Sequence, residues 1–360
     1  VLIACASFFD WDGVECYAGG AERYVTDLAR LFQELGFDVR IVQPSRRAFT
    51  NPYGNFVIEG IPVSRPEDFR AVSTRLDPEC RNAHLVVASP VDLACQFSHP
   101  RIIGINHGID WDHRFNRRYN YSTRKFAAAA QGVTNSLLTV AVDTNFINWL
   151  RTVDYELARR VRYVPNYVDH SIFQFTTKDF SSELVCLYPR RLYEARGLYI
   201  TGAAFHSLLA RYHDLKLVLA GQIDSEADRN LLEALCRSFP GRVVWQECPP
   251  DAIHRLYREA HIVLIPTAYS EGTSLACLEA MASNCGIIAT NVGGLPNLVL
   301  HEFNGLLIGP EPGELCLAIE RLYRDRQLLE QLARNAYQVS LRFSKSLWEQ
   351  RWLQLLEDVI

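Results

Sequence analysis

Between Tyr269 and Gly294 the sequence reads Y-S-E-G-T-S-L-A-C-L-E-A-M-A-S-N-C-G-I-I-A-T-N-V-G-G. A short apolar run, residues 262–265, precedes this stretch, and a second run, residues 286–289, lies inside it. We therefore predict a strand, a turn, a helix and a second strand in this order. Units of this kind build parallel sheets, and ligands bind where the strands of such sheets end.

Two glutamates, Glu271 and Glu279, stand eight positions apart in this stretch. Glu271 falls in the predicted turn, and Glu279 falls one to two turns inside the predicted helix 274–282. Eight residues rotate an ideal helix by about 80° beyond two full turns, so the carboxylates are expected to meet different parts of one extended ligand. The turn, with the first amides of the helix, suits hydroxyls on a phosphorylated ligand. The alternative for Glu271 is the plain preference of glutamate for a helix start.

The rest of the chain alternates apolar runs with helical patterns, as parallel β-α-β units do. Before residue 165 the predicted strands are 1–7, 39–42, 85–88, 102–105, 137–142 and 161–164, and 21–35 is a predicted helix. After a linker at 165–182, the predicted strands are 184–188, 215–220, 243–245, 262–265, 287–289 and 306–308. The helices predicted there are 198–212, 226–238, 253–258, 274–282 and 313–332, and a last helix at 344–360 is expected to pack on the first domain.

The composition is that of an ordinary water-soluble protein. The chain has 360 residues, 48% hydrophobic and 22% charged, and its net charge of −4 does not favour nucleic acid as a partner. The ten cysteines include no C-x-x-C pair, so we expect small buried thiols, such as Cys5, Cys186 and Cys277, in a reducing compartment. No apolar run reaches the ~20 residues that span a bilayer, and no secretory signal is visible, so we expect a cytoplasmic location. The chain opens at Val1 within a strand-like run, so we expect a trimmed chain or a piece of a longer protein.

Two places in the first half resemble ligand loops. Gly19 and Gly20 close the loop after the first predicted strand, where backbone can approach a ligand closely, although a plain turn is the alternative. His107 follows the strand 102–105 directly, so it is expected at a ligand-binding strand end rather than in a structural role. The fingerprint G-x-G-x-x-G is absent, which argues against a nicotinamide dehydrogenase.

Two acidic triplets, Asp10-Trp11-Asp12 and Asp110-Trp111-Asp112, could hold a divalent metal on a diphosphate. We favour solvated loop acids, because so short a pattern arises easily by chance.

The segment 114–126 reads R-F-N-R-R-Y-N-Y-S-T-R-K-F and contains no acidic residue. It is interpreted as a solvated surface segment. The alternative is a patch, carried by Arg117, Arg118, Arg124 and Lys125, for an anionic acceptor or an acidic membrane face.

A basic loop follows the strand 184–188. Arg191 and Arg196 could clamp a diphosphate there, because the guanidinium fork matches phosphate oxygens. A solvated basic loop is the alternative.

Taken in order along the chain, these stretches resemble a retaining glycosyltransferase of family 4, which has the GT-B fold. The matching residues are Gly19-Gly20-Ala21-Glu22, His107, Pro165-Asn166, Val168-Asp169, Phe173, Arg191, Arg196-Gly197, Glu271-Gly272, Glu279-Ala280-Met281, Gly293-Gly294-Leu295-Pro296, Asn304-Gly305-Leu306-Leu307 and the closing helix. The resemblance implies an α/β fold of two Rossmann-like domains facing a cleft. The expected domains are 1–170 with the C-terminal helix 343–360, for the acceptor, and 171–342, for the nucleotide-sugar donor.

The resemblance also implies roles for the site residues. Glu279 holds the ribose hydroxyls, Glu271 lies near the transferred sugar, and Arg191 and Arg196 neutralise the diphosphate. Amides of Gly272, Thr273 and Ser274 assist; Gly19 and Gly20 lie near the phosphate or acceptor, and His107 lies near the sugar.

The implied function is retaining transfer from a UDP- or GDP-linked sugar to a glycan, lipid-linked or small-molecule acceptor, with no cofactor and no metal. Peripheral contact with an anionic membrane at the inner face is a further expectation, whereas nucleic acid is not expected and the oligomeric state is left open. The alternatives are a nucleotide-sugar epimerase, a sugar phosphorylase or a catalytically silent nucleotide-sugar-binding protein of the same fold.

Four departures from the family pattern mark the chain. Arg196 replaces a usual lysine, Tyr167 a usual glycine and Asn297 a common acid, and Asn284-Cys285-Gly286 replaces Gly-x-Pro.

Overall fold

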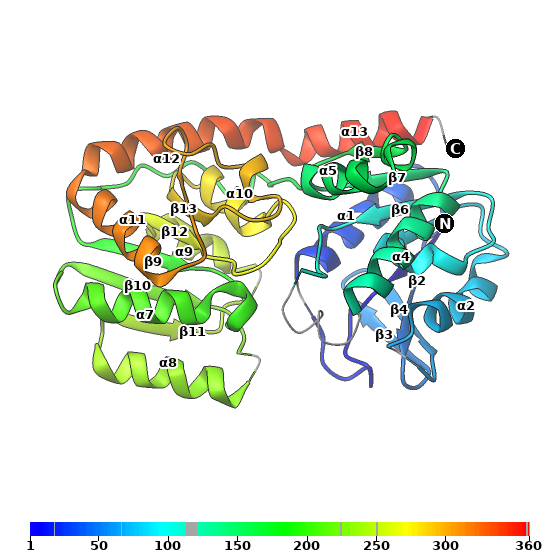
Figure 1. Cartoon of the computed structure of the whole chain (residues 1–360), viewed down its shortest axis with the longest axis horizontal. Helices are drawn as coiled ribbons and strands as arrows, with labels where there is room; N and C mark the ends of the chain where they lie inside the picture. Colours follow the sequence, from blue (N-terminus) through cyan, green and yellow to red (C-terminus); the bar gives the residue numbers. More distant parts are fainter. Residues whose placement is uncertain are drawn as a thin grey trace. The chain divides into compact units, whose positions relative to one another are not determined.

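The computed structural model describes residues 1–360 except 18, 66, 113–120, 224, 250, 358 and 360. It divides into two compact units, Val1–Pro165 with Glu349–Ile360, and Asn166–Trp348. Each unit has a sheet flanked by helices (Figure 1). The predicted class, two α/β domains with parallel sheets, is confirmed.

Among the described residues, the sheet of the first unit has the strand order β3-β4-β2-β1-β5-β6-β7-β8. Its strands are β1 Leu2–Cys5, β2 Arg40–Ser45, β3 Phe49–Tyr53, β4 Phe56–Pro62, β5 Val86–Ser89, β6 Ile102–Asn106, β7 Leu138–Ala141 and β8 Val161–Tyr163. All neighbouring pairs are parallel except β3 with β4. Because β2 and β5 flank β1, the strand order reverses at β1, where a ligand site is expected.

The antiparallel hairpin β3–β4 was not predicted. Its signal is present, since Gly54-Asn55 separates two runs of strand-forming residues. Pro52 is tolerated in β3 because this strand lies at the edge of the sheet.

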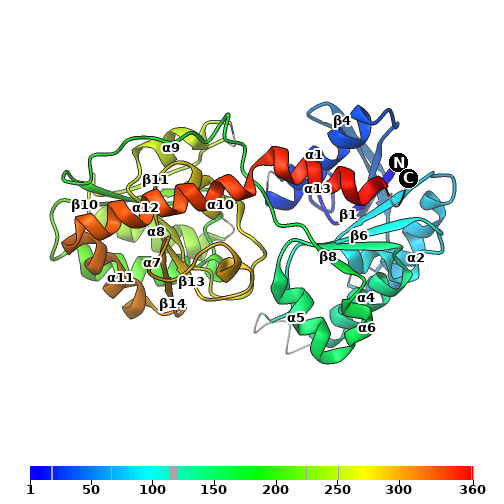
Figure 2. The same cartoon turned by 90° about the horizontal axis from the view of Figure 1, so that it is seen from above.

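The helices of the first unit are α1 Gly20–Glu34, α2 Phe69–Cys80, the 3₁₀ helix η1 Val91–Gln96, α4 Tyr121–Asn135, α5 Thr144–Val153 and α6 Tyr155–Ala158. The helix α1 buries Leu28 and Phe32 completely. The final helix, α13 Lys345–Glu357, reaches this unit with its C-terminal part, which lies beside α1 (Figure 2). There Trp352 is fully buried, and its indole N–H donates to the hydroxyl of Tyr24 at 3.0 Å.

Among the described residues of the second unit, the sheet is parallel throughout and has the order β11-β10-β9-β12-β13-β14. Its strands are β9 Leu184–Tyr188, β10 Leu215–Ala220, β11 Val243–Gln246, β12 Ile262–Ile265, β13 Gly286–Thr290 and β14 Leu306–Ile308. Successive residues of one strand enter different cores: Ile262 and Leu264 face one, and Val263 and Ile265 face the other. The sheet is therefore covered on both faces, as its unbroken apolar strands require.

The helices that cover this sheet are α7 Leu198–Leu209, α8 Glu226–Ser238, α9 Ile253–Glu259, α10 Leu275–Ala282, α11 Pro312–Arg324 and α12 Arg326–Ser340, and short 3₁₀ turns occur at η2 Glu194–Arg196, η3 Leu295–Asn297 and η4 Leu341–Phe343. The single helix predicted at 313–332 is wrong, because it divides at Asp325. The Asp325 carboxylate accepts a hydrogen bond from the Leu328 amide at 2.9 Å and so begins a new helix.

The unusual Tyr167 has a packing role within the second unit. Its ring lies 4.4 Å from that of Trp348, between centroids, and both side chains are buried. An aromatic residue in place of glycine therefore adds apolar contact to the start of α13.

Candidate functional site

The two strands at the reversal of the second sheet, β9 and β12, are direct neighbours. Arg190 follows β9 by two residues, and Glu271 follows β12 in the turn that leads into α10. Because parallel strands end at the same edge of a sheet, these two loops meet. The predicted strand–turn–helix around Glu271 is confirmed.

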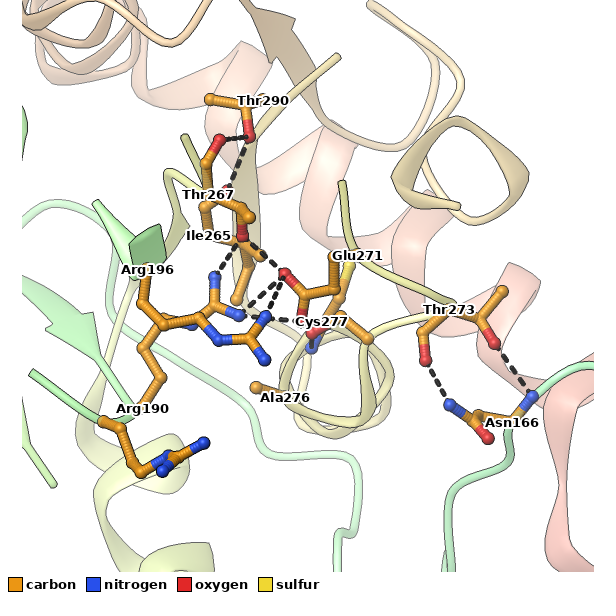
Figure 3. A network of polar contacts seen from close by, with 12 residues as sticks. Asn166, Arg190, Arg196, Ile265, Thr267, Glu271, Thr273, Ala276, Cys277 and Thr290 are labelled. Carbon is orange, nitrogen blue, oxygen red and sulfur yellow. Dashed lines mark hydrogen bonds and ion pairs between the residues drawn. The ribbon is translucent and has the colours of Figure 1, made fainter. Parts of the chain in front are cut away.

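The Glu271 carboxylate lies in a partly buried polar cluster (Figure 3). Arg190 Nη2 donates to both carboxylate oxygens at 2.7 Å, and Thr267 Oγ1 donates to Oε2 at 2.5 Å. Arg196 Nη1 adds an ion pair with Oε2 at 3.3 Å. One carboxylate thus meets two guanidinium groups and a hydroxyl.

The charge on Glu271 follows from these contacts. Burial alone would raise the pKa of this carboxyl, but the positive charges of Arg190 and Arg196, with hydrogen bonds from Arg190 and Thr267, lower it to about 2. Burial likewise opposes the charge on Arg196, yet the neighbouring carboxylate of Glu271 raises the pKa of this guanidinium. Glu271 is therefore an anion at any pH at which the protein would work.

The arginines that contact Glu271 are Arg190 and Arg196. The diphosphate-binding role predicted for Arg191 and Arg196 stays a prediction. The side chain of Arg191 is exposed, and its guanidinium lies 5.4 Å from the ring centroid of Tyr193. Arg190 was missed, because neighbouring residues of a loop cannot be told apart by sequence when both are arginine.

Two glycines allow the loops of this cluster to approach each other closely. Gly293 has φ +54°, and a Cβ there would lie 2.2 Å from the carbonyl oxygen of Glu271. Gly197 has φ +88°, and a Cβ there would lie 1.9 Å from the carbonyl oxygen of Pro266. Both positions demand glycine for close packing of backbone on backbone. The loop that carries Arg196 is also fixed by Tyr188, whose hydroxyl donates to the Arg196 carbonyl at 2.8 Å.

The helix α10 carries the second predicted carboxylate. Glu279 is buried, and the hydroxyl of Tyr257 donates to its Oε2 at 2.8 Å. Ser274 is the N-cap of α10, and its Oγ accepts from the Cys277 amide at 3.4 Å. The predicted placement of Glu271 before the helix and Glu279 inside it is confirmed.

Thr273 and Gly272 are buried in the same turn. Asn166 holds Thr273 twice: its amide N–H donates to Thr273 Oγ1 at 2.9 Å, and its side chain donates to the Thr273 carbonyl at 2.5 Å (Figure 3). The side chain of Thr273 therefore supports the turn.

The first unit holds the remaining candidates. His107 follows β6, and its Nε2 lies 2.7 Å from the hydroxyl of Ser89 at the end of β5. The ring of Tyr24 packs edge-on against His107 with centroids 5.2 Å apart, and the hydroxyl of the same tyrosine accepts the hydrogen bond from Trp352. Burial lowers the pKa of His107 to about 4, so this imidazole is neutral near pH 7.

Gly19 and Gly20 stand at the start of α1, as predicted, with Gly19 as its N-cap. The Gly19 carbonyl accepts from the Arg23 amide at 3.2 Å. The structure thus places these glycines at a helix N-terminus of the first unit.

The acidic triplets make contacts of their own. Asp10 Oδ1 accepts from the backbone amides of Val14 and Glu15 at 2.6 and 3.1 Å, and Asp12 pairs with Arg46 at 2.9 Å. In the part of the chain that the structure describes, no group of three His, Cys, Asp or Glu side chains is arranged to hold a metal.

The basic segment is described only from residue 121 onward, so Arg117 and Arg118 lie outside the described residues. Both interpretations of this segment, a solvated surface segment and an exposed patch, are wrong for Lys125. It is buried, and its Nζ lies 2.8 Å from Asp92 and 3.6 Å from Asp110. A lysine in a helix next to the buried Asp92 forms an internal ion pair, which the local sequence does not reveal. No helix of the described residues is long and apolar enough to cross a membrane.

The architecture matches known structures over nearly the whole chain. Sucrose-phosphate synthase from Thermosynechococcus elongatus superimposes with a TM-score of 0.78 at 19% identity, covering 99% of this chain and 98% of that one. The Anabaena protein HepE, solved in complex with UDP-glucose, superimposes with a TM-score of 0.75 at 18% identity, covering 99% of both chains. These likenesses define the fold as that of the GT-B glycosyltransferases.

Family models identify the chain more closely. The model for glycosyltransferase family 4 matches residues 18–172, and that for glycosyl transferases group 1 matches residues 171–339. The chain belongs to the family 4 glycosyltransferases.

Two curated relatives each match less than half of the chain. An uncharacterized glycosyltransferase of Methanocaldococcus jannaschii is 32% identical over 158 residues, 43% of this chain and 39% of that protein. The D-inositol 3-phosphate glycosyltransferase of Corynebacterium urealyticum is 31% identical over 176 residues, 46% of this chain and 40% of that protein. The chain thus matches about two fifths of the length of these relatives.

Proposed function

We propose that the protein transfers a sugar from a nucleoside-diphosphate sugar to an acceptor hydroxyl, with retention of the anomeric configuration and without a metal. The observation that carries this proposal is Glu271, held ionised between Arg190 and Arg196 where β9 and β12 end. Such a cluster offers a carboxylate to sugar hydroxyls and guanidinium groups to phosphate oxygens.

The remaining residues of the second unit receive roles in donor binding. Glu279 accepts hydrogen bonds from the ribose hydroxyls, and Arg191 and Arg196 bind the diphosphate. The amides of Gly272, Thr273 and Ser274, at the N-terminus of α10, add donors for phosphate oxygens.

Cleavage of the anomeric C–O bond builds positive charge on the sugar and negative charge on the departing phosphate. Fixed guanidinium groups stabilise that negative charge, and one preorganised donor of this kind is typically worth about 10²–10³ in rate. The arginines therefore supply the electrostatic effect for which other enzymes use a metal. Both oxygens of Glu271 accept hydrogen bonds from Arg190, which disfavours its use as a covalent nucleophile. We therefore favour front-face attack, in which the leaving phosphate takes the proton of the acceptor hydroxyl.

In the first unit, Gly19 and Gly20 are assigned to the acceptor or phosphate side, and His107 to a sugar hydroxyl. A neutral imidazole can both donate and accept a hydrogen bond. The lowered pKa of His107 supports this neutral role rather than that of a cationic phosphate ligand.

The nature of the donor is taken from relatives. The structural neighbour HepE is solved with UDP-glucose, which favours a UDP-linked donor over a GDP-linked one. The acceptor is proposed to be a glycan, a lipid-linked molecule or a small molecule, because one relative is a D-inositol 3-phosphate glycosyltransferase and another is a lipopolysaccharide 1,2-N-acetylglucosaminetransferase of Salmonella typhimurium.

The test is a thermal-shift panel of UDP-, GDP- and ADP-sugars, followed by a transfer assay with the donor that stabilises most. Stabilisation follows RT ln(1 + [L]/Kd), so the right donor stands out at equal concentration. The anomeric configuration of the product, read by NMR, then checks retention, and the same assay with EDTA checks metal independence. Binding without transfer to any acceptor would favour a silent binding protein, and conversion of the donor sugar itself would favour an epimerase.

A further inference from the structure

Arg190 is more buried than Arg196 and forms more hydrogen bonds to neighbouring side chains. Its side chain is 7% exposed. Its Nη1 donates to Thr267 Oγ1 and its Nη2 donates to both oxygens of Glu271, each at 2.7 Å. Both terminal nitrogens of the guanidinium therefore have protein partners.

Thr267 closes this arrangement. Its hydroxyl accepts from Arg190 and donates to Glu271, and its carbonyl accepts from Thr290 Oγ1 at 2.7 Å (Figure 3). Arg190 comes after β9, Thr267 and Glu271 come after β12, and Thr290 ends β13. Three neighbouring strand ends thus fix the orientation of one carboxylate.

Arg196 has a different environment. Its side chain is 30% exposed, and its contact with Glu271 is a single ion pair at 3.3 Å. Because an arginine carries five N–H donors, Arg196 retains donors for an incoming anion.

The charges of the cluster also distinguish Arg190 from Arg196. One carboxylate and two guanidinium groups leave one positive charge in excess. Since Arg190 forms the closer and more buried pair with Glu271, the excess charge lies at Arg196. An incoming diphosphate therefore meets the field of Arg196 rather than that of Arg190.

We propose that Arg190 is a positioning residue that orients Glu271 for sugar transfer, while Arg196 binds the diphosphate. This inference rests on the proposed function of the site. The fork of Arg190 bonds Glu271 and Thr267 together, and a lysine, which is a compact point charge, cannot reproduce that geometry.

The experiment compares Arg190→Lys and Arg190→Gln with Arg196→Lys and Arg196→Gln. Arg334→Gln serves as the control, because Arg334 forms an exposed helix pair with Glu330 at 2.5 Å. Calorimetry with UDP, and separately with GDP, gives nucleotide Kd, and the transfer assay gives kcat and KM.

We expect Arg190→Lys to lower kcat by about 10²-fold, the effect of misplacing a group by about 1 Å, with nucleotide Kd within about twofold of wild type. We expect the Arg196 variants to weaken nucleotide Kd by about tenfold or more. The pH profile adds a second reading. The wild-type rate should show no acid limb between pH 4 and 6, whereas the limb of Arg190→Gln should move upward, because Glu271 loses its closest positive partner.

An increase of nucleotide Kd in Arg190→Lys equal to that in Arg196→Lys would overturn the assignment, because Arg190 would then contact the diphosphate. Wild-type kcat in Arg190→Lys would also overturn it. Arg190→Lys keeps the charge and is expected to fold even if Arg190→Gln does not. Lack of nucleotide binding and transfer in the wild-type protein would instead overturn the proposed function, and this role with it.

Discussion

The two units each hold a titratable side chain at a strand end, and they hold it in opposite states. In the second unit, Glu271 is ionised because Arg190 and Arg196 surround it. In the first unit, His107 is neutral because it is buried against Ser89 and the ring of Tyr24.

The difference shows how the same kind of position acquires different chemistry. At Glu271, two guanidinium groups surround one carboxylate, which leaves one positive charge in excess. Because this charge is in place before any ligand binds, the second unit is suited to an anionic ligand. A neutral imidazole prepares the first unit for hydroxyl groups. The identity of the neighbours, and not the place in the fold, sets the protonation state.

The largest expected effect comes from removing the anion of the second unit. Glu271→Gln keeps the shape of the side chain and loses its charge, so kcat should fall by about 10²–10³-fold. UDP affinity should be retained or should increase, because the excess positive charge rises from one to two. Transfer near the wild-type rate would contradict the role proposed for Glu271. Thermal unfolding of the variant shows whether the fold is kept.

The next effect in size comes from Arg196. Arg196→Ala should weaken UDP or GDP binding by about 1.5–3 kcal/mol, the range for hydrogen bonds to charged groups. Calorimetry measures it directly. Unchanged affinity would move the diphosphate away from Arg196, and would leave Arg191 as the arginine to test next.

The comparison also shows how far the sequence alone could predict the site. Glu271 and Glu279 were placed in the turn and in the helix because apolar strands flank them and Ser274 begins the helix. His107 was placed by its strand in the same way. Strand-end residues are accessible to this reasoning because the alternation of strand and helix fixes the edge at which they lie.

Contacts between side chains of different loops could not be predicted from the sequence. Nothing in the local pattern tells that Arg190, rather than Arg191, turns toward Glu271, or that Thr267 joins them, because these contacts depend on the side-chain direction of each loop residue. Lys125 failed for a related reason: its partner Asp92 is 33 positions away in the sequence. The helix break at Asp325 and the hairpin at Gly54-Asn55 could have been predicted, because an N-cap residue and a turn dipeptide mark them. Both were overlooked because the elements were assigned from hydrophobic periodicity over longer stretches.

A smaller effect is expected on the stability of the first unit, where Tyr24 packs between His107 and Trp352. Tyr24→Phe removes the acceptor of the Trp352 N–H, a group in a fully buried side chain, and should destabilise the first unit by about 1–3 kcal/mol. Denaturant unfolding measures the loss. A double-mutant cycle with Trp352→Phe separates the hydrogen bond from packing, and no coupling between the two changes would show that the bond contributes nothing.

The smallest expected effect is the pH dependence that His107 gives to stability. The unfolded histidine takes up a proton near pH 6.5, but the folded one does so only near 4, so acid favours the unfolded state between these values. His107→Gln removes this pH dependence, so between pH 7.5 and 5.5 the variant should lose about 1 kcal/mol less stability than the wild type. Denaturant unfolding of both proteins at the two pH values measures the difference. Equal losses would mean that His107 takes up its proton at the same pH in the folded and the unfolded protein. Burial would then not be the cause of its neutral state, and the contrast with Glu271 would fail.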